Sequence, residues 1–285
     1  MELHLKINEM GGNVLKNYIS ILESLKTNAI ELQPIELQSL ITFMIENIGN
    51  TDPYIRDTLI YSGFCELILN EKVTLEQVTN ILQTCIDDEH LYLNIHQNEQ
   101  NDAVFVRSFS ALVIALILYK DSENRFLPEA LIQTALKKSG NYLSLETDYR
   151  GYVEKKGWAH AVAHGSDLLA QVILHPLFDS NFSINQCIMT LQKCLNTNYA
   201  YIDEEEERML PVIDALVQKG LSDEQLKNWL MNLSDIEEND DLIKYRKQWN
   251  VKKFMFTLYA HLLRTKKCEE TSNWIYNNFI LRESI

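Results

Sequence analysis

The segment DAVFVRSFSALVIALILY, residues 102–119, is the stretch of this 285-residue chain that decides the fold. Its apolar residues recur at spacings of three and four and occupy almost the whole circumference of a helix. A helix that is apolar on every side lies inside a protein or a membrane. The uninterrupted apolar run 111–119 is only about half the length that a membrane span needs. The segment therefore predicts a central helix covered by other helices.

The same helical period continues along the rest of the chain, and alternating strand patterns are almost absent. The predicted helices cover residues 13–26, 35–48, 53–69, 75–87, 102–119, 128–138, 144–155, 157–174, 184–195, 204–218, 223–232, 243–264 and 269–281. Three pairs have the spacing of a capping box, in which two side chains bind exposed amides at a helix start: Thr74 with Gln77, Ser183 with Gln186, and Ser222 with Gln225. We expect well over half of the residues to be helical and strands to be marginal.

The connections between the predicted helices are short, apart from the polar segment 88–101. Short connections predict that consecutive helices pack antiparallel. We find no strict sequence repeat, so we expect an all-α fold built as an irregular stack of antiparallel helix pairs, similar to HEAT and armadillo proteins in general layout. Residues 1–285 are interpreted as one domain, with the acidic segment 234–241 as the best candidate for a boundary or a loop.

Composition limits the class of partner. The chain carries 40 acidic and 26 basic residues, a net charge of −14, and such a field repels nucleic acid and anionic membrane surfaces. We therefore expect neither as a partner. The N-terminal sequence lacks the basic start and apolar run of a secretory signal. The five cysteines are odd in number without CxxC spacing, which is typical of reduced thiols and predicts a cytoplasmic location.

One segment predicts a functional site: DYRGYVEKKGWAHAVAHGSDLLAQVILHP, residues 148–176. On a helix that begins at Gly157, His160, His164 and Asp167 fall within a narrow arc, and apolar residues occupy the opposite face. Two His at i and i+4 can bind one divalent transition metal such as Zn²⁺, with Asp167 as a third ligand or as the partner that orients an imidazole. Gly165 costs helix stability, which a close approach by a neighbouring helix or a ligand would explain.

The same residues can act without a metal, either as an acid and a base or as ligands of a small polar molecule. A hydrogen-bond network with a structural role is a further interpretation. The spacing is not the HExxH signature of zinc proteases, because Ala161 follows His160. A metal site would need a ligand from elsewhere in the chain, and the candidates are Glu154, Asp203, Glu207 and His261.

Four further charged residues are candidates for the ligand site, namely Arg107, Arg150, Glu207 and Arg208. Arg150 lies just upstream of the His segment and can bind an anion or an acidic side chain. We expect it beside the imidazoles, with Glu207 and Arg208 as the next neighbours. Arg107 needs a carboxylate or carbonyl partner if it is buried, which favours a structural role.

The charged residues of DPYIRD, 52–57, can form a functional cluster, but they also fit the first turn of a helix. Asp52 precedes Pro53 as an N-cap. Asp52 and Arg56 have the i, i+4 spacing of a helical ion pair. We therefore expect a structural pair between Asp52 and Arg56.

Several pieces of the chain resemble a bacterial family catalogued as domain of unknown function 2785. They are DPYIRD (52–57), VFVRSFSALV (104–113), DYRGYVEKKGWAHAVAHGSDLL (148–169) and the pair Glu207-Arg208, and together they span residues 52–210. The resemblance implies an all-helical bacterial protein. It also implies that a polar set belongs to the family: Asp52, Arg56, Asp57, Arg107, Arg150, His160, His164, Asp167, Glu207 and Arg208. It assigns no activity or role to these residues.

We therefore expect a helical protein in which His160, His164 and Asp167 line a cleft that binds a metal or a small polar ligand. If the protein is an enzyme, which the sequence leaves open, hydrolysis by a metal-bound water is the natural chemistry. The alternative is a non-catalytic helical scaffold that binds a peptide or a partner protein.

Overall fold

The structure is a computed structural model, and it describes residues 15–27, 32–97, 100–178 and 184–281. It is about 70% helical. The described residues contain one sheet, which has two short strands. The predicted all-α class is confirmed.

Most elements follow one another with short connections, and the connecting segment 86–102 is long, as predicted. The helices are α2 (Pro34–Glu46), α3 (Ser62–Leu69), α4 (Leu75–Cys85), α5 (Ala103–Asn124), α6 (Glu129–Leu145), α7 (Ala161–Leu174), α8 (Ile184–Leu195), α9 (Glu205–Arg208), α10 (Leu210–Gln218), α11 (Asp223–Leu233), α12 (Asp241–Thr265) and α13 (Glu269–Ile275). Residues 15–26 are also helical, and two π-helical segments are η1 (Tyr54–Tyr61) and η2 (Tyr276–Ile280). Strands β1 (Tyr152–Val153) and β2 (Gly157–Trp158) form an antiparallel hairpin.

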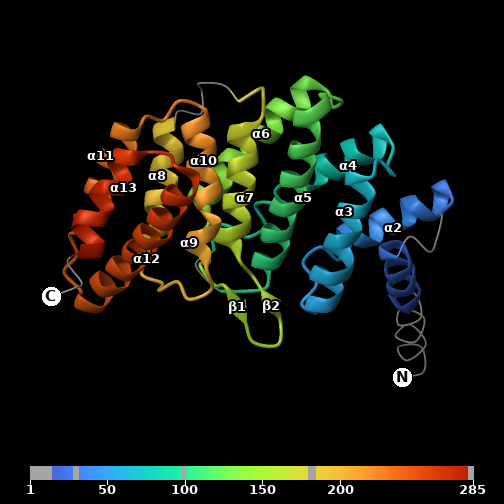
Figure 1. Cartoon of the computed structure of the whole chain (residues 1–285). Helices are drawn as coiled ribbons and strands as arrows, with labels where there is room; N and C mark the ends of the chain where they lie inside the picture. Colours follow the sequence, from blue (N-terminus) through green and yellow to red (C-terminus); the bar gives the residue numbers. More distant parts are fainter. Residues whose placement is uncertain (1–14, 28–31, 98–99, 179–183, 282–285) are drawn as a thin grey trace.

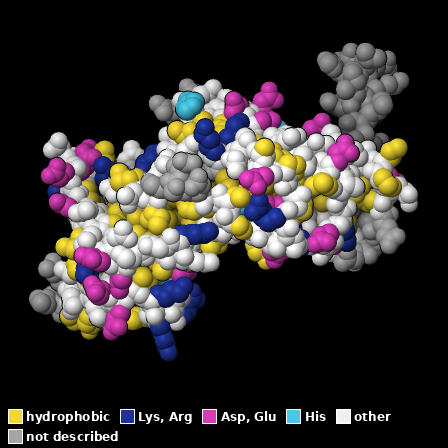
Figure 2. Space-filling view, turned by 90° about the horizontal axis from the view of Figure 1, so that it is seen from above, with side chains coloured by type: hydrophobic (Ala, Val, Ile, Leu, Met, Phe, Trp, Pro, Cys, Tyr) yellow, Lys and Arg dark blue, Asp and Glu magenta, His cyan; other side chains and the backbone are white. Residues whose placement is uncertain are grey.

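The helices stand side by side in an extended row that broadly follows the sequence (Figure 1). The N-terminal helices lie at one end, α5, α6 and α7 lie in the middle, and α8 to α13 lie at the other end, while the β1–β2 hairpin projects below the row. Seen from above, acidic and basic side chains are interspersed, with hydrophobic side chains between them (Figure 2). The capping boxes predicted at Thr74 and Ser222 are present, at the starts of α4 and α11, and Ser183 of the third lies outside the described residues.

α5 is the buried helix that its apolar sequence predicts. It is also the one helix in the described part of the chain that is long and apolar enough to cross a membrane, and 72% of its apolar window is buried within the protein. α5 packs against α7 as well as against α3 and α4. Its apolar circumference is therefore accounted for by the helices around it.

α7 belongs to both of the main hydrophobic clusters. Leu168 and Val172 pack into a cluster formed mainly by the N-terminal helices, α5 and α6, whereas Val162 and Ile173 pack into a cluster formed mainly by α8 to α13. α7 consequently contacts α5, α6 and α10 and is buried on most sides. The prediction that the helix over 157–174 has one polar, uncovered face is therefore wrong.

The close approach predicted at Gly165 is made by a neighbouring helix. A Cβ atom at this position would lie 2.8 Å from Leu143 Cδ1 and 3.2 Å from Tyr142 Cε1, both on α6. The missing side chain lets α6 and α7 come together, and this packing offsets the cost of about 1 kcal/mol that glycine brings to a helix interior.

The main difference from the predicted elements lies between α6 and α7. Instead of a helix over 144–155, α6 ends at Leu145 and the chain continues into the hairpin. Glu146 explains the break, because its Oε1 accepts the backbone N–H groups of Thr147 and Asp148 at 2.9 Å each, bonds that compete with helical ones. α7 therefore begins at Ala161 and not at Gly157, which has a positive φ of 75° in the hairpin.

Candidate functional site

The two histidines of the predicted site are brought together at the start of α7. His160 is the residue before the helix and has a left-handed backbone, with φ 44° and ψ 37°. Its carbonyl accepts the backbone N–H of His164 at 2.8 Å, which closes the first helical turn. The two imidazole rings are perpendicular, with centroids 5.8 Å apart. The sequence thus predicts the pairing correctly, although His160 does not lie on the helix itself.

Aromatic rings extend this pair in both directions. Trp158 of β2 stacks on His160 with 4.4 Å between ring centroids, and Tyr152 of β1 meets Trp158 edge-on at 5.0 Å. On the inner side, Phe109 of α5 meets His164 at 5.1 Å. A row of rings therefore runs from Tyr152, which is 54% exposed, to the core. A helix that began at Gly157 would place Trp158 on the face opposite the histidines, but Trp158 belongs to the hairpin and stacks on His160.

Both imidazoles are held in the neutral form. Burial, helped by the positive charge of Arg208, lowers the pKa of His160 to about 4, while Asp203 acts in the opposite direction. Burial also places the pKa of His164 well below its usual range, and the charges of Arg208 and Arg56 lower it further. Neither ring carries a proton charge near neutral pH.

One nitrogen of each ring is buried without a hydrogen-bond partner: His160 Nε2 and His164 Nδ1. Backbone hydrogen bonding, to Asp203 for His160 and to Ser108 for His164, raises the pKa of each ring. A bond that raises the pKa is one in which the ring donates its N–H. We therefore assign the single N–H of each neutral imidazole to the nitrogen that bonds to backbone, and this assignment makes the two bare nitrogens acceptors.

The side chain of Asp167 bonds to Arg208 of α9 and not to the histidines. Its carboxylate accepts hydrogen bonds from Arg208, with Nε to Oδ1 at 3.2 Å and a second contact between Nη2 and Oδ2. Burial raises the pKa of Asp167 in spite of this pair. The predicted convergence of His160, His164 and Asp167 is therefore found only for the two imidazoles.

Arg56 of η1 packs against Phe109, the same ring that contacts His164. It is fully buried, with its guanidinium 4.3 Å from the ring centroid of Phe105 and 4.8 Å from that of Phe109. Its ion-pair partner is Asp57, at 2.8 Å. Asp52, the predicted partner, instead accepts the backbone N–H of Tyr54 at 2.8 Å, as an N-terminal cap.

Arg56 also holds the hairpin. Its Nη2 donates to the carbonyl of Lys156 at 2.8 Å, and its Nη1 donates to the carbonyl of Asn50 at 2.7 Å. Lys156 is held a second time by an ion pair with Asp102 at 2.7 Å. The segment that covers His160 is thus fixed to η1 and to the residue before α5.

The other predicted arginines have partners away from the imidazoles. Arg107 makes a two-pronged bond to Glu146, at 2.8 and 2.7 Å, as expected of a buried structural arginine. Arg150 pairs with Asp148, with Nε to Oδ1 at 2.9 Å, so the expectation that its guanidinium lies beside the histidines is wrong. Arg208 is the arginine whose charge lowers the pKa of both imidazoles.

Of the three predicted metal ligands on the His segment, only His160 and His164 lie side by side. In the part of the chain that the structure describes, no group of three or more His, Cys, Asp or Glu side chains is placed to hold a metal ion. Of the further candidates, His261 pairs with Asp214 at 2.9 Å, Asp203 accepts the backbone N–H of Tyr152 at 2.9 Å, and Glu154 and Glu207 are exposed.

Two buried glutamates next to the site were not predicted from the sequence. Glu205 and Glu206 are 1% and 4% exposed, and Glu205 Oε1 and Glu206 Oε2 have no hydrogen-bond partner. Burial raises the pKa of Glu205 to about 7. The apolar residues that flank the acidic run 203–207, Tyr201 and Met209, are both fully buried, and they are the sequence signal that the run enters the core.

Burial raises the pKa of every cysteine thiol, which disfavours the reactive thiolate form. All five are free. Burial raises the pKa of Cys187 and of Cys194 to about 12, so these thiols stay protonated.

Comparison with known proteins adds a family and no activity. No curated protein and no solved structure matches the chain. A family described as "Protein of unknown function (DUF2785)" matches residues 91–262, which include α5, the hairpin, α7 and α9. This match covers more than half of the chain and contains His160, His164, Asp167 and Arg208, so the chain belongs to the DUF2785 family.

Proposed function

We propose that the His160–His164 pair binds a small polar ligand that donates hydrogen bonds, through hydroxyl or amide N–H groups. The observation that carries this proposal is the pair of buried acceptor nitrogens, His160 Nε2 and His164 Nδ1, neither of which has a partner. Buried polar atoms are nearly always satisfied, because an unsatisfied one costs about 1–3 kcal/mol. Two such atoms on neighbouring rings support a common partner that donates to both.

The charges around the pair favour a neutral donor over a metal ion. Arg208 disfavours a proton on either imidazole, and Arg56 disfavours one on His164. The same positive potential opposes a divalent cation. Asp167, the acidic side chain on α7 next to the pair, is neutralised by Arg208.

The protonation states favour binding over acid–base catalysis. An efficient general base has a pKa near the working pH, and the pKa of His160 is about 4. A base this weak accepts a hydrogen bond well but removes a proton poorly near neutral pH. We therefore propose a binding protein, and hydrolysis is the less supported interpretation.

A ligand would reach the pair from the side of the hairpin. Trp158 stacks on His160 and is 41% exposed, so it separates the imidazole from solvent. Arg56 and Asp102 hold the hairpin at Lys156 and at the carbonyl of Trp158, and Asp203 holds it at the backbone N–H of Tyr152, whereas the indole of Trp158 packs against the rings of Tyr152 and His160. A small shift of Trp158 would open the site without breaking the packing of α7.

Nitrogen-15 NMR of the histidine side chains tests the protonation states. We expect both rings to be neutral at pH 7, with the proton of His164 on Nε2 and that of His160 on Nδ1, because burial and Arg208 oppose the charged form. His160 should become charged only near pH 4. His96, which is exposed, provides the solvated reference. A charged imidazole at either position at pH 6 would contradict the proposed acceptor pair.

Ligand binding itself is tested with His164→Phe, which keeps a ring against Phe109 but removes the acceptor. Glycerol, acetamide and Zn²⁺ are titrated into wild-type protein and followed by isothermal titration calorimetry and by the histidine signals. We expect glycerol or acetamide to shift the signals of His160 and His164, and the binding to be lost in His164→Phe but kept in the matched surface variant His96→Phe.

The other outcomes separate the rival interpretations. If wild type binds Zn²⁺ stoichiometrically and His164→Phe does not, the pair is a metal site and not a site for a hydrogen-bond donor. If none of the three probes binds and His164→Phe is as stable as wild type or more so, the pair is a structural part of the core and the proposed function is wrong.

A further inference from the structure

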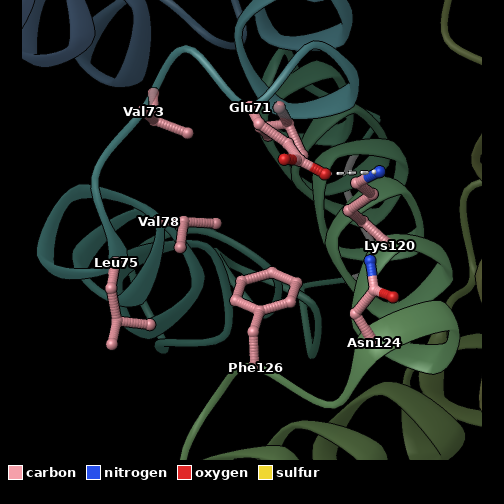
Figure 3. Close-up of a pocket in the computed structure, with 8 residues that line it drawn as sticks. Glu71, Val73, Leu75, Val78, Lys120, Asn124 and Phe126 are labelled. Carbon is pink, nitrogen blue, oxygen red and sulfur yellow. Dashed lines mark ion pairs between the residues drawn. The ribbon is translucent and has the colours of Figure 1, made fainter.

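A cavity far from the histidines lies between the turn that joins α3 to α4 and the junction of α5 with α6 (Figure 3). Its volume is about 400 Å³, which falls in the range of small-molecule sites. The cavity has two unlike sides. Val73, Val78 and the ring of Phe126 form an apolar side, whereas Glu71, Lys120 and Asn124 form a polar one (Figure 3).

The apolar side is open to a ligand. Phe126 and Val73 are partly exposed, and Leu75, which also lines the cavity, is 55% exposed. Apolar surface that gathers in a hollow is typical of a binding site, whereas single exposed apolar residues are ordinary.

The polar side, taken together with Glu123 next to it, carries an excess of negative charge. The ammonium group of Lys120 lies 3.0 Å from a carboxylate oxygen of Glu71 and 3.3 Å from one of Glu123. One positive charge is therefore shared between two negative charges. Glu71 is 69% exposed while Lys120 is only 15% exposed, so the carboxylate is the charged group that a ligand meets first.

We propose that this cavity binds an amphiphilic amine, with its cationic head at Glu71 and its apolar body against Phe126, Val73 and Val78. The charge excess selects a cation over an anion, since Lys120 already has two carboxylate partners. The Phe126 ring stands beside the charged wall (Figure 3), where its face can also attract a cation. The proposal is independent of the histidine site.

Three probes of one shape separate charge from apolar contact: 2-phenylethylamine, 2-phenylethanol and 3-phenylpropionate. Each is titrated into the full chain, and the methyl NMR signals of Val73, Leu75 and Val78 report binding at the cavity. We expect the amine to bind with a dissociation constant about fivefold lower than that of the alcohol, the gain that an exposed ion pair can give. The propionate should bind most weakly.

Glu71→Gln should bring the amine to the affinity of the alcohol, because it removes the charge and keeps the shape. Glu270→Gln is the matched control, since Glu270 is 65% exposed and pairs with Lys227 at 2.6 Å at the other end of the molecule. It should leave the binding of all three probes unchanged. The proposal is overturned if these methyl signals do not move, if the alcohol binds as tightly as the amine, if the propionate binds more tightly, or if Glu71→Gln has no effect.

Discussion

An Arg56→Ala variant should lose about 3–5 kcal/mol of unfolding free energy, the usual cost of removing one partner from a buried charge pair. The side chain is fully buried, stacks between Phe105 and Phe109, and pairs with Asp57. Its removal leaves a partly buried carboxylate without its counter-charge. It also leaves the carbonyl of Lys156 without its donor and opens a cavity in front of α5.

Urea denaturation followed by circular dichroism measures this loss. Arg246→Ala is the control, because Arg246 donates a single exposed hydrogen bond to the carbonyl of Asn198 and should cost less than about 1 kcal/mol. The hairpin should also loosen, which hydrogen exchange at Ala159 and His160 would reveal, since their amides bond to Gly151 and Arg150. A loss for Arg56→Ala as small as for the control would mean that the guanidinium is not a structural tie.

Glu205→Gln should stabilise the protein at pH 8 and leave it nearly unchanged at pH 4. Burial raises the pKa of Glu205 to about 7 from an ordinary 4.5, so the fold holds the neutral acid more readily than the unfolded chain does. The stabilising contribution of this group is complete below pH 4.5 and is lost as the pH rises to 7. At one unit of pKa per 1.36 kcal/mol, the loss above pH 7 is about 3 kcal/mol.

Unfolding free energies between pH 4 and pH 8 test this. Wild type should lose more stability than Glu205→Gln between pH 5 and pH 7, and Glu207→Gln, an exposed change on the same helix, should follow wild type. The two imidazoles act in the opposite direction, because their lowered pKa values stabilise the fold above pH 6.5 and this contribution fades towards pH 4. The imidazoles are the same in wild type and in Glu205→Gln, so subtracting one unfolding free energy from the other removes their contribution. If the two free energies change with pH in parallel, Glu205 ionises normally.

The helices could be predicted from sequence because their signals are local. The apolar circumference of 102–119 and the capping boxes depend on residues a few positions apart, and α5, α4 and α11 follow them. The end of α6 has no such signal. It depends on Glu146 reaching Arg107, 39 residues earlier in the chain, and the residues of 144–155 alone show ordinary helical periodicity.

In the candidate site, too, only the contacts between residues close in sequence could be predicted. His160 and His164 are four residues apart, so a helical turn brings them together, and the pairing is found. Arg150 was expected beside them because it is near in sequence, but Arg208 takes that place because α9 packs against α7. The left-handed backbone of His160, which lets Trp158 stack on its ring, leaves no mark in the sequence.

The position of α7 between two hydrophobic clusters has a consequence for cooperativity. A helix that supplies side chains to both clusters cannot leave one of them without exposing the other. The two ends of the row are therefore thermodynamically linked through one helix, although they share few other contacts. His164 lies in the first turn of α7. A ligand bound to the imidazole pair would therefore stabilise both hydrophobic clusters against unfolding.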